Sequence, residues 1–166
     1  MKFSVVPIAV EHTLSFRECL DSVARERRYP AQVEALPLER IQGFVSESVA
    51  NGSVQFVALD GQRVVGWADI FSAWAHAVAH TGKLGMGVKK SYRCQGLGRR
   101  LLEASIADAW AKGLTRIELE VRADNAPAIH LYERLGFAHE AVKRRAMRFD
   151  GIYFDAVQMS LLRNET

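Results

Sequence analysis

A glycine-bearing turn constrains the fold of this chain more than any other feature. The apolar stretch 84–88 is followed by the segment 93–98, which reads Arg-Cys-Gln-Gly-Leu-Gly, and apolar residues at helical spacing then continue to Gly113. The first N–H groups of a helix have no intrahelical partner, and glycine lets an anion approach them because it has no Cβ. The sequence therefore predicts a strand, a phosphate-binding turn and a helix in succession.

The distribution of charge narrows the kind of anion that this turn would bind. The 166 residues carry 22 Lys+Arg and 19 Asp+Glu, a net charge of +3. Residues 83–100 contribute six of the basic residues and no acidic one, so the rest of the chain sums to 16 − 19 = −3. This local excess indicates a bound phosphate-containing ligand and excludes a polybasic nucleic-acid tail.

Periodicity along the chain predicts a mixed α/β fold in a single domain, residues 1–166. Asp60-Gly61 and Asp150-Gly151 are signals of tight hairpin turns. The expected order is β-α-α-β-β-β-α-β-α-β-β, with strands 3–8, 54–59, 63–71, 84–88, 117–121, 137–149 and 152–162, and helices 12–28, 38–49, 98–112 and 125–132.

The sequence also predicts where in the cell the protein is found. No apolar run reaches the roughly 18 residues of a membrane span, and the opening segment resembles a strand more than a signal peptide. Two cysteines, Cys19 and Cys94, are too few for a disulfide framework and indicate a reducing compartment. We expect a cytoplasmic protein without membrane association.

Two familiar phosphate-binding motifs do not fit the turn. A P-loop ends in Gly-Lys-Ser/Thr, which this chain lacks, and a dinucleotide fingerprint requires a glycine where Leu101 stands. By contrast, Arg93-x-x-Gly96-x-Gly98 and the later Asn125-x-x-Ala-Ile-x-Leu-Tyr132-Glu-x-x-Gly136-Phe resemble two motifs of the GCN5-related N-acetyltransferase (GNAT) superfamily. With the matching element order, this resemblance covers nearly the whole chain.

The resemblance implies a function and a cofactor site. The protein would transfer acetyl from acetyl-CoA to a primary amine by direct attack, with the thioester between two splayed central strands. The pyrophosphate would lie on the turn and the pantetheine arm along the preceding strand. The residues that this assigns to the cofactor are Met86, Gly87, Val88, Arg93, Gln95, Gly96, Leu97, Gly98, Arg99 and Asn125.

The resemblance also implies catalytic groups. Tyr132 is similar in position to the usual general acid, and a phenol with a pKa of about 10 stays protonated at neutral pH. Glu120 resembles the base of members that acetylate protein N-termini. Glu118, His80 and a water relay remain alternative bases. Some members of the superfamily instead carry an acid in the preceding strand, but residues 80–85 of this chain contain no carboxylate.

The acceptor is the least determined part of the site. Candidate binding residues are Tyr29, Trp67, Asp69 and Tyr153, and the spacing of Trp67 and Asp69 places them on one sheet face, as an aromatic wall with an anionic hook for an ammonium group. The similarity of residues 119–137 favours a protein N-terminus, whereas Trp67 and Trp74 would favour a narrower pocket for a small-molecule amine. A homodimer is left open.

Other classes of function explain the sequence less well. An acyl-CoA-binding sensor or scaffold without turnover is the main alternative, and the presence of Tyr132 and Glu120 argues against it. Nucleic-acid binding through residues 83–100 lacks interleaved aromatic residues other than Tyr92. The five histidines show no metal-ligand spacing, and we expect no metal.

Overall fold

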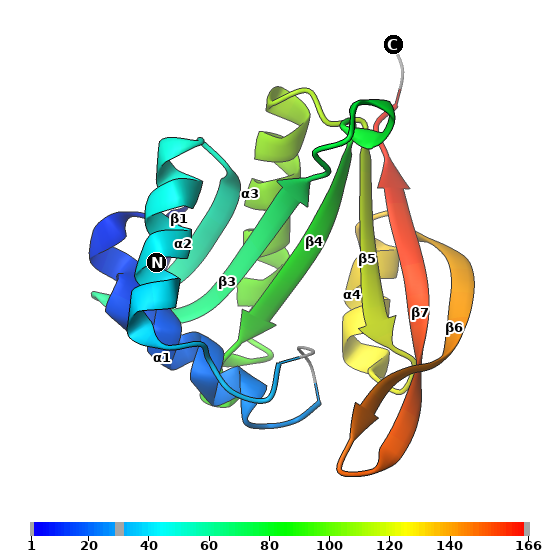
Figure 1. The fold of residues 1–166 in the computed structure, drawn as a ribbon, viewed down its shortest axis with the longest axis horizontal. Coiled ribbons are helices and arrows are strands. Elements are labelled where there is room, and N and C mark those ends of the chain that lie inside the picture. Colours follow the sequence, from blue (N-terminus) through cyan, green and yellow to red (C-terminus); the bar gives the residue numbers. More distant parts are fainter. Residues whose placement is uncertain (1, 29–31, 165–166) are drawn as a thin grey trace.

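Seven strands form one mixed sheet with two helices on each face (Figure 1). The structure is a computed structural model that describes residues 2–28 and 32–164. In the sheet the strands lie in the order β1-β2-β3-β4-β5-β7-β6. The elements are β1 Phe3–Pro7, α1 Thr13–Ala24, α2 Leu38–Ala50, β2 Val54–Asp60, β3 Arg63–Ser72, β4 Thr81–Val88, α3 Leu97–Ala111, β5 Arg116–Arg122, α4 Ala126–Arg134, β6 Ala138–Phe149 and β7 Ile152–Leu162.

The predicted mixed α/β fold and its element order are confirmed, and two boundaries differ by three residues or more. The first helix ends at Ala24 and not at residue 28, because the chain turns at Arg27, whose φ is 52°. The strand expected from residue 84 begins at Thr81. Gly82 reads as a loop residue, but a Cβ there would lie 2.4 Å from Ile70 Cγ2, so glycine lets this strand pack closely.

The hydrophobic core lies in two layers, one on each side of the sheet. Between the sheet and α1 with α2, Phe16, Val45, Val57 and Trp67 are buried in one cluster. On the opposite face α3 and α4 cover two further clusters. Their buried members include Ile70, Leu84, Leu97, Leu101, Leu102, Ile117, Leu119, Tyr132, Phe137 and Met159. The polar helix faces turn outward, as amphipathic patterning requires.

The sheet opens between its two central strands. β4 and β5 run parallel but pair only where Thr81, Gly82 and Lys83 face residues 116–118. Beyond Lys83 the strands part, which Figure 1 shows as a wedge that widens towards the carboxyl ends of both strands. The expected splayed strands are therefore confirmed, and residues 84–88 keep a sheet edge that no strand of the described chain occupies on the β5 side.

Within the described residues, no helix is both long and apolar enough to cross a membrane.

Candidate active site

The turn between β4 and α3 has the backbone conformation of an anion cradle. Gly96 is the N-cap of α3 with φ 78°, a left-handed value that favours glycine, and a Cβ there would meet nothing within 4 Å. Cys94 is also left-handed, with φ 60°. No side-chain hydrogen bond caps the helix at Gly96. The first N–H groups of this 15-residue helix and its positive dipole end are thus available to an anion.

Gly98, the second motif glycine, has a packing role. A Cβ on Gly98 would lie 3.3 Å from both Met86 Cε and Leu131 Cδ2. It therefore brings the start of α3 close to β4 and α4. Leu97, between the two glycines, is buried beneath the sheet and anchors the turn from below.

The polar residues of the turn divide into anchored and exposed groups. Arg93 donates its guanidinium to both carboxylate oxygens of Glu26, at 2.9 and 2.6 Å, and its Nε to the Val88 carbonyl at 2.9 Å. It thereby ties the turn to the end of α1, and its contact with a pyrophosphate stays a prediction. Gln95 and Arg99 are exposed at the mouth of the turn, where Arg99 pairs with Glu103.

The proposed general acid lies beneath the sheet opening. Tyr132 is 6% exposed and packs against Phe137, with ring centroids 5.7 Å apart, in the cluster that contains Leu84 of β4 and Leu119 of β5. Burial raises the pKa of the Tyr132 phenol above its ordinary value, so the hydroxyl stays protonated well into the alkaline range.

Asn125 stands at the start of the same helix. Its Oδ1 accepts from the Ala128 N–H at 3.4 Å, which confirms the expected N-cap of α4. This bond leaves the side chain fixed beside the end of β5, where the strands are apart. Its contact with the cofactor arm stays a prediction.

The expected base, Glu120, is paired with its neighbours. Its Oε1 accepts from Lys143 Nζ at 3.0 Å and from Gln158 Nε2 at 3.3 Å. Partial burial acts to raise the pKa of Glu120, but the hydrogen bond and charge of Lys143, helped by Lys83 and Gln158, outweigh it and leave the pKa below its ordinary value. Glu120 is therefore held as a carboxylate by cations.

The two alternative bases are placed less favourably. Glu118 is 44% exposed at its side chain and pairs with Arg116 at 3.3 Å. His80 lies just before β4, and its carbonyl accepts from the N–H groups of Thr115 and Arg116. That end of β4 is where the two central strands are hydrogen-bonded, not where they part.

Asp69 has a different environment from the other acids of this sheet face. It lies on β3 directly opposite Gly85 of β4, and its Oδ1 is 3.1 Å from the point where a Cβ of Gly85 would stand. Burial raises the pKa of Asp69 to about 7, only partly offset by a hydrogen bond from the Gly85 N–H. Within residues 2–28 and 32–164 no cation pairs with it.

Trp67 is a core residue, which corrects the expectation of an open aromatic wall. Its ring is 5% exposed and packs edge-to-face on Phe16 of α1 with centroids 6.1 Å apart. The ring also fills the space over Gly87, where a Cβ would lie 2.3 Å from it. Trp67 and Asp69 do share a face, and each lies over a glycine in the open part of β4, Trp67 over Gly87 and Asp69 over Gly85.

The remaining acceptor candidates are spread out. Tyr29 lies outside the described residues. Tyr153 is half exposed near the tip of the β6–β7 hairpin, where Arg145 and Arg148 stack on its ring. Trp74 is 97% exposed in the β3–β4 connection and narrows no pocket. One contact that no local sequence pattern predicts is an ion pair between Arg27 after α1 and Asp150 at the hairpin tip.

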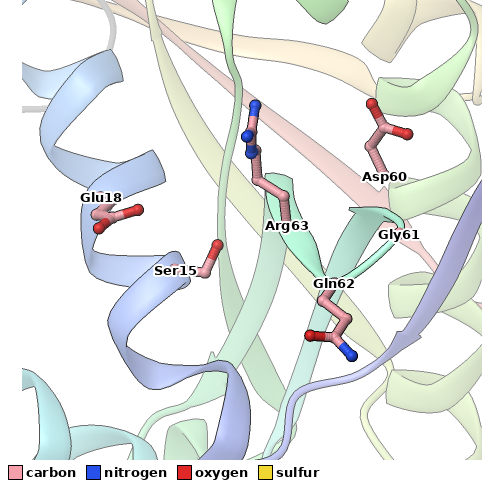
Figure 2. Close-up of a pocket in the computed structure, with 6 residues that line it drawn as sticks. All are labelled: Ser15, Glu18, Asp60, Gly61, Gln62 and Arg63. Atoms are coloured by element: carbon pink, nitrogen blue, oxygen red, sulfur yellow. The ribbon is translucent and has the colours of Figure 1, made fainter.

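Of two hollows on the surface of the described chain, the larger one is lined by no residue of the turn 93–98. Figure 2 shows it between α1 and the β2–β3 turn, where Ser15, Asp60 and Arg63 line about 560 Å³. Ser15 Oγ accepts from the Val64 N–H and Asp60 from the Tyr92 hydroxyl, so both groups serve the fold. A smaller hollow of about 190 Å³ lies at the open end of β5, lined by Arg28, Arg122, Asp124, Asn125 and Pro127.

No group of three or more His, Cys, Asp or Glu in the described part of the chain could hold a metal ion. The buried thiol of Cys19 is also unreactive, because burial raises its pKa to about 12.

Comparison with known proteins agrees with this geometry. The chain is 42% identical over 76 residues to the [ribosomal protein bS18]-alanine N-acetyltransferase of Escherichia coli strain K12, a match that covers 46% of this chain and 51% of that protein. It is 32% identical over 111 residues to the L-amino acid N-acetyltransferase AaaT of the same strain, covering 66% of this chain and 68% of that protein. The first of these matches thus spans about half the length of the curated relative.

The fold has close structural counterparts. The structure of yncA from Salmonella typhimurium, solved with its cofactor acetyl-CoA, superposes with a TM-score of 0.92 at 18% identity, over 100% of this chain and 96% of that one. Residues 16–137, which contain the turn, the sheet opening, Asp69 and Tyr132, match the acetyltransferase (GNAT) family. The chain therefore belongs to the acetyltransferase (GNAT) family.

Proposed function

We propose that this protein transfers the acetyl group of acetyl-CoA to the α-amine of a free amino acid. The observation that carries the proposal is the combination of an open glycine turn with a strand edge that faces a widening gap. Family membership supports acetyl transfer as the reaction. A protein N-terminus is the competing acceptor class, and the experiment below separates the two.

The residues present fit acetyl-CoA at three points. The Gly96 turn offers N–H groups and a positive helix end to phosphates, with no Cβ in the way. The edge of residues 84–88 can pair with an extended amide-containing arm as an added strand would. Apolar Met86 and Leu84 border the gap and would exclude water from the reacting end.

Bound acetyl-CoA would supply an activated acetyl thioester. An N–H of β4 near Val88 would donate to the thioester oxygen and stabilise the charge that develops there. Tyr132, protonated because of its burial, would give a proton to the departing sulfur. No metal is needed for these roles, since each is filled by a group already in place.

The proposed acceptor class rests on the shape of the face opposite the helices α3 and α4. Arg27, which follows α1, forms an ion pair with Asp150 at the tip of the β6–β7 hairpin, and this pair joins segments from the two sides of the sheet opening. A bridged entrance suits a small amine better than an extended chain. The match to AaaT, which covers about two thirds of both proteins, supports the same class.

The test is thiol release from acetyl-CoA with a matched panel of acceptors. The panel contains the twenty free L-amino acids and two peptides with Ala or Ser at the amino terminus, each beside an N-acetylated counterpart that offers no α-amine. We expect release with at least one free amino acid, at a kcat/KM at least tenfold above either peptide. Faster release with a peptide would replace the acceptor class. Binding of acetyl-CoA without release from any acceptor would favour an acyl-CoA-binding module.

A further inference from the structure

We propose that Asp69, and not Glu120, is the group that takes the proton from the acceptor ammonium. This inference rests on the proposed acetyl transfer and deepens it, because it assigns the base. From the sequence alone, Asp69 is expected only to bind an ammonium group through its negative charge. Here it also accepts a proton from that group.

The first argument is the position of Asp69 relative to the sheet opening. Asp69 pairs with Gly85, and Gly85 lies two residues beyond Lys83, the last β4 residue that pairs with β5. The Asp69 carboxylate lies where the side chain of Gly85 would be, 3.1 Å from the ideal Cβ point. A glycine at this register thus lets a β3 carboxylate lean across β4 towards the gap.

The second argument is a buried polar side chain, Gln55, on the strand next to that of Asp69. Gln55 on β2 lies opposite Asp69 in the sheet register and is 2% exposed. Its Oε1 accepts from Ser48 Oγ of α2 at 2.6 Å, which fixes the amide, and its Nε2 is buried without a hydrogen-bond partner. Leaving such a donor unpaired costs about 1–3 kcal/mol, so a functional reason is expected. Gln55 thus holds an unpaired donor one strand away from Asp69, with no hydrogen bond between the two side chains, and we expect this donor to favour the ionised form of the carboxyl.

The third argument is the absence of compensating charge around Asp69 in the described chain. On α1 and α2, which cover this face, Arg17 and Asp21 bind the connection between the helices, and the other charged residues, Glu18, Glu39, Arg40 and Glu47, are exposed. On β4, Lys83 lies on the same face, but its charge acts on Glu120. With a pKa of about 7, Asp69 can be a carboxylate before transfer and a neutral acid after it.

The proton balance of the step is closed by groups already described. Asp69 removes one proton from the acceptor ammonium, and the freed nitrogen forms a bond to the acetyl carbon while the carbon–sulfur bond breaks. Tyr132 gives its phenolic proton to the sulfur and takes one from the new amide nitrogen. Asp69 then releases its proton to water. The products are the N-acetylated acceptor, free CoA thiol and one proton.

The test measures kcat against pH, from 5.5 to 9, at saturating concentrations of acetyl-CoA and of the fastest free amino acid in the panel. Wild type should lose activity as the pH falls through about 7, and this decrease is the acidic limb of its pH profile. Asp69→Asn, which keeps the shape of the side chain, should lower kcat at pH 7.5 by about 100-fold or more and remove this limb. Glu120→Gln should keep the limb. Asp108→Asn, which removes a partly exposed acid of α3 that pairs with Lys112, should match wild type throughout.

A second set of measurements separates catalysis from folding and from simple substrate anchoring. Burial of the Asp69 charge destabilises the native state above its unfolded pKa, so Asp69→Asn should unfold at a higher temperature than wild type at pH 8 and at a similar one at pH 4. Its affinity for acetyl-CoA should be unchanged. Gln55→Met should move the acidic limb to higher pH. An anchoring role would instead raise KM for the amine and restore kcat at saturation.

The outcomes distinguish this inference from the proposed function. Thiol release by wild type together with an unaltered limb in Asp69→Asn, or with loss of the limb in Glu120→Gln, would overturn the role of Asp69 and leave acetyl transfer standing. No thiol release by wild type with any acceptor would overturn both.

Discussion

Acidic side chains on the two sides of the sheet opening have opposite surroundings. On the side of β5, β7 and β6 three acidic residues have cationic partners: Glu120 pairs with Lys143, Glu140 of β6 with Arg116, and Asp124 with Arg122. On the side of β3 and β4, Asp69 faces a glycine and has no ion pair in the described chain. The first arrangement holds strands in register, and the second leaves a carboxylate free to exchange a proton.

The titration behaviour of these acids follows from that difference. Hydrogen bonds from Arg116 and Ser160 lower the pKa of Glu140 to about 2, whereas burial raises that of Asp69 to about 7. A group whose pKa lies near neutrality can serve as a base at the pH of the cell, and one that is locked as an ion pair serves structure. The comparison therefore separates scaffold from chemistry within one sheet.

The largest effect is expected on the β4 side, at the anion cradle. Gly96→Asp would place a negative carboxylate and a strained side chain where phosphates bind, since Gly96 has φ 78°. Calorimetric titration should show acetyl-CoA affinity reduced by at least 100-fold. Gly61→Asp is the matched control, because Gly61 is also left-handed and open but lies in the β2–β3 turn. Equal affinity in both variants would show that the turn at Gly96 does not bind the phosphates of acetyl-CoA.

The next effect concerns the acid beneath the gap. Tyr132→Phe keeps the packing against Phe137 and removes only the hydroxyl. We expect kcat to fall by about 100-fold while the affinity for acetyl-CoA stays within about twofold, because general acid catalysis contributes that order of acceleration. Steady-state kinetics beside calorimetry measure both quantities. A kcat equal to that of wild type would remove Tyr132 from the mechanism.

A third prediction concerns stability on the β4 side. Gly87→Ala would push a Cβ into the Trp67 ring, 2.3 Å away, and should reduce the free energy of unfolding by about 1–3 kcal/mol. Gly43→Ala in α2 meets nothing within 4 Å and should instead gain about 0.5–1 kcal/mol from helix propensity. Chemical denaturation measures both. A loss in Gly43→Ala as large as that in Gly87→Ala would show that packing against Trp67 is not the cause.

The smallest effect is expected on the ion-paired side. Glu120 has a lowered pKa, so its pair with Lys143 stabilises the fold above the ordinary glutamate range and loses that contribution as the pH falls through the folded-state value. Lys143→Met should therefore cost less than about 1 kcal/mol at pH 7, because Lys143 is 49% exposed, and progressively less as the pH falls through the folded-state pKa of Glu120. Lys112→Met, which breaks an exposed pair on α3, is the control. A cost of several kcal/mol would show that the charged network carries the fold.

The turn and the fold were predictable because local patterns determine them. Gly96 and Gly98, the helical spacing after them and the Asp-Gly hairpin turns are signals within a few residues of one another. The start of β4 was missed because glycine is typical of loops, and the need for glycine at position 82 comes from close packing against Ile70 and Leu114, which are distant in sequence.

The site was less predictable because its properties depend on distant partners. The pairing of Arg93 with Glu26 joins residues that are 67 positions apart, and burial of Trp67 depends on Phe16 of the first helix. The sequence also does not distinguish Glu120 from Asp69, because both are acidic residues within predicted strands. Which of them meets a lysine and which meets a glycine is decided by strand register.

The most direct test of this contrast is the titration of both carboxyl groups in one sample. Carbon-13 NMR of protein labelled at aspartate and glutamate side-chain carboxyls, assigned with Asp69→Asn and Glu120→Gln, reports each pKa separately. We predict that Asp69 titrates near pH 7 and Glu120 below the ordinary glutamate value of 4.5. Titration of Asp69 near pH 4, or of Glu120 at a higher pH than Asp69, would contradict the account.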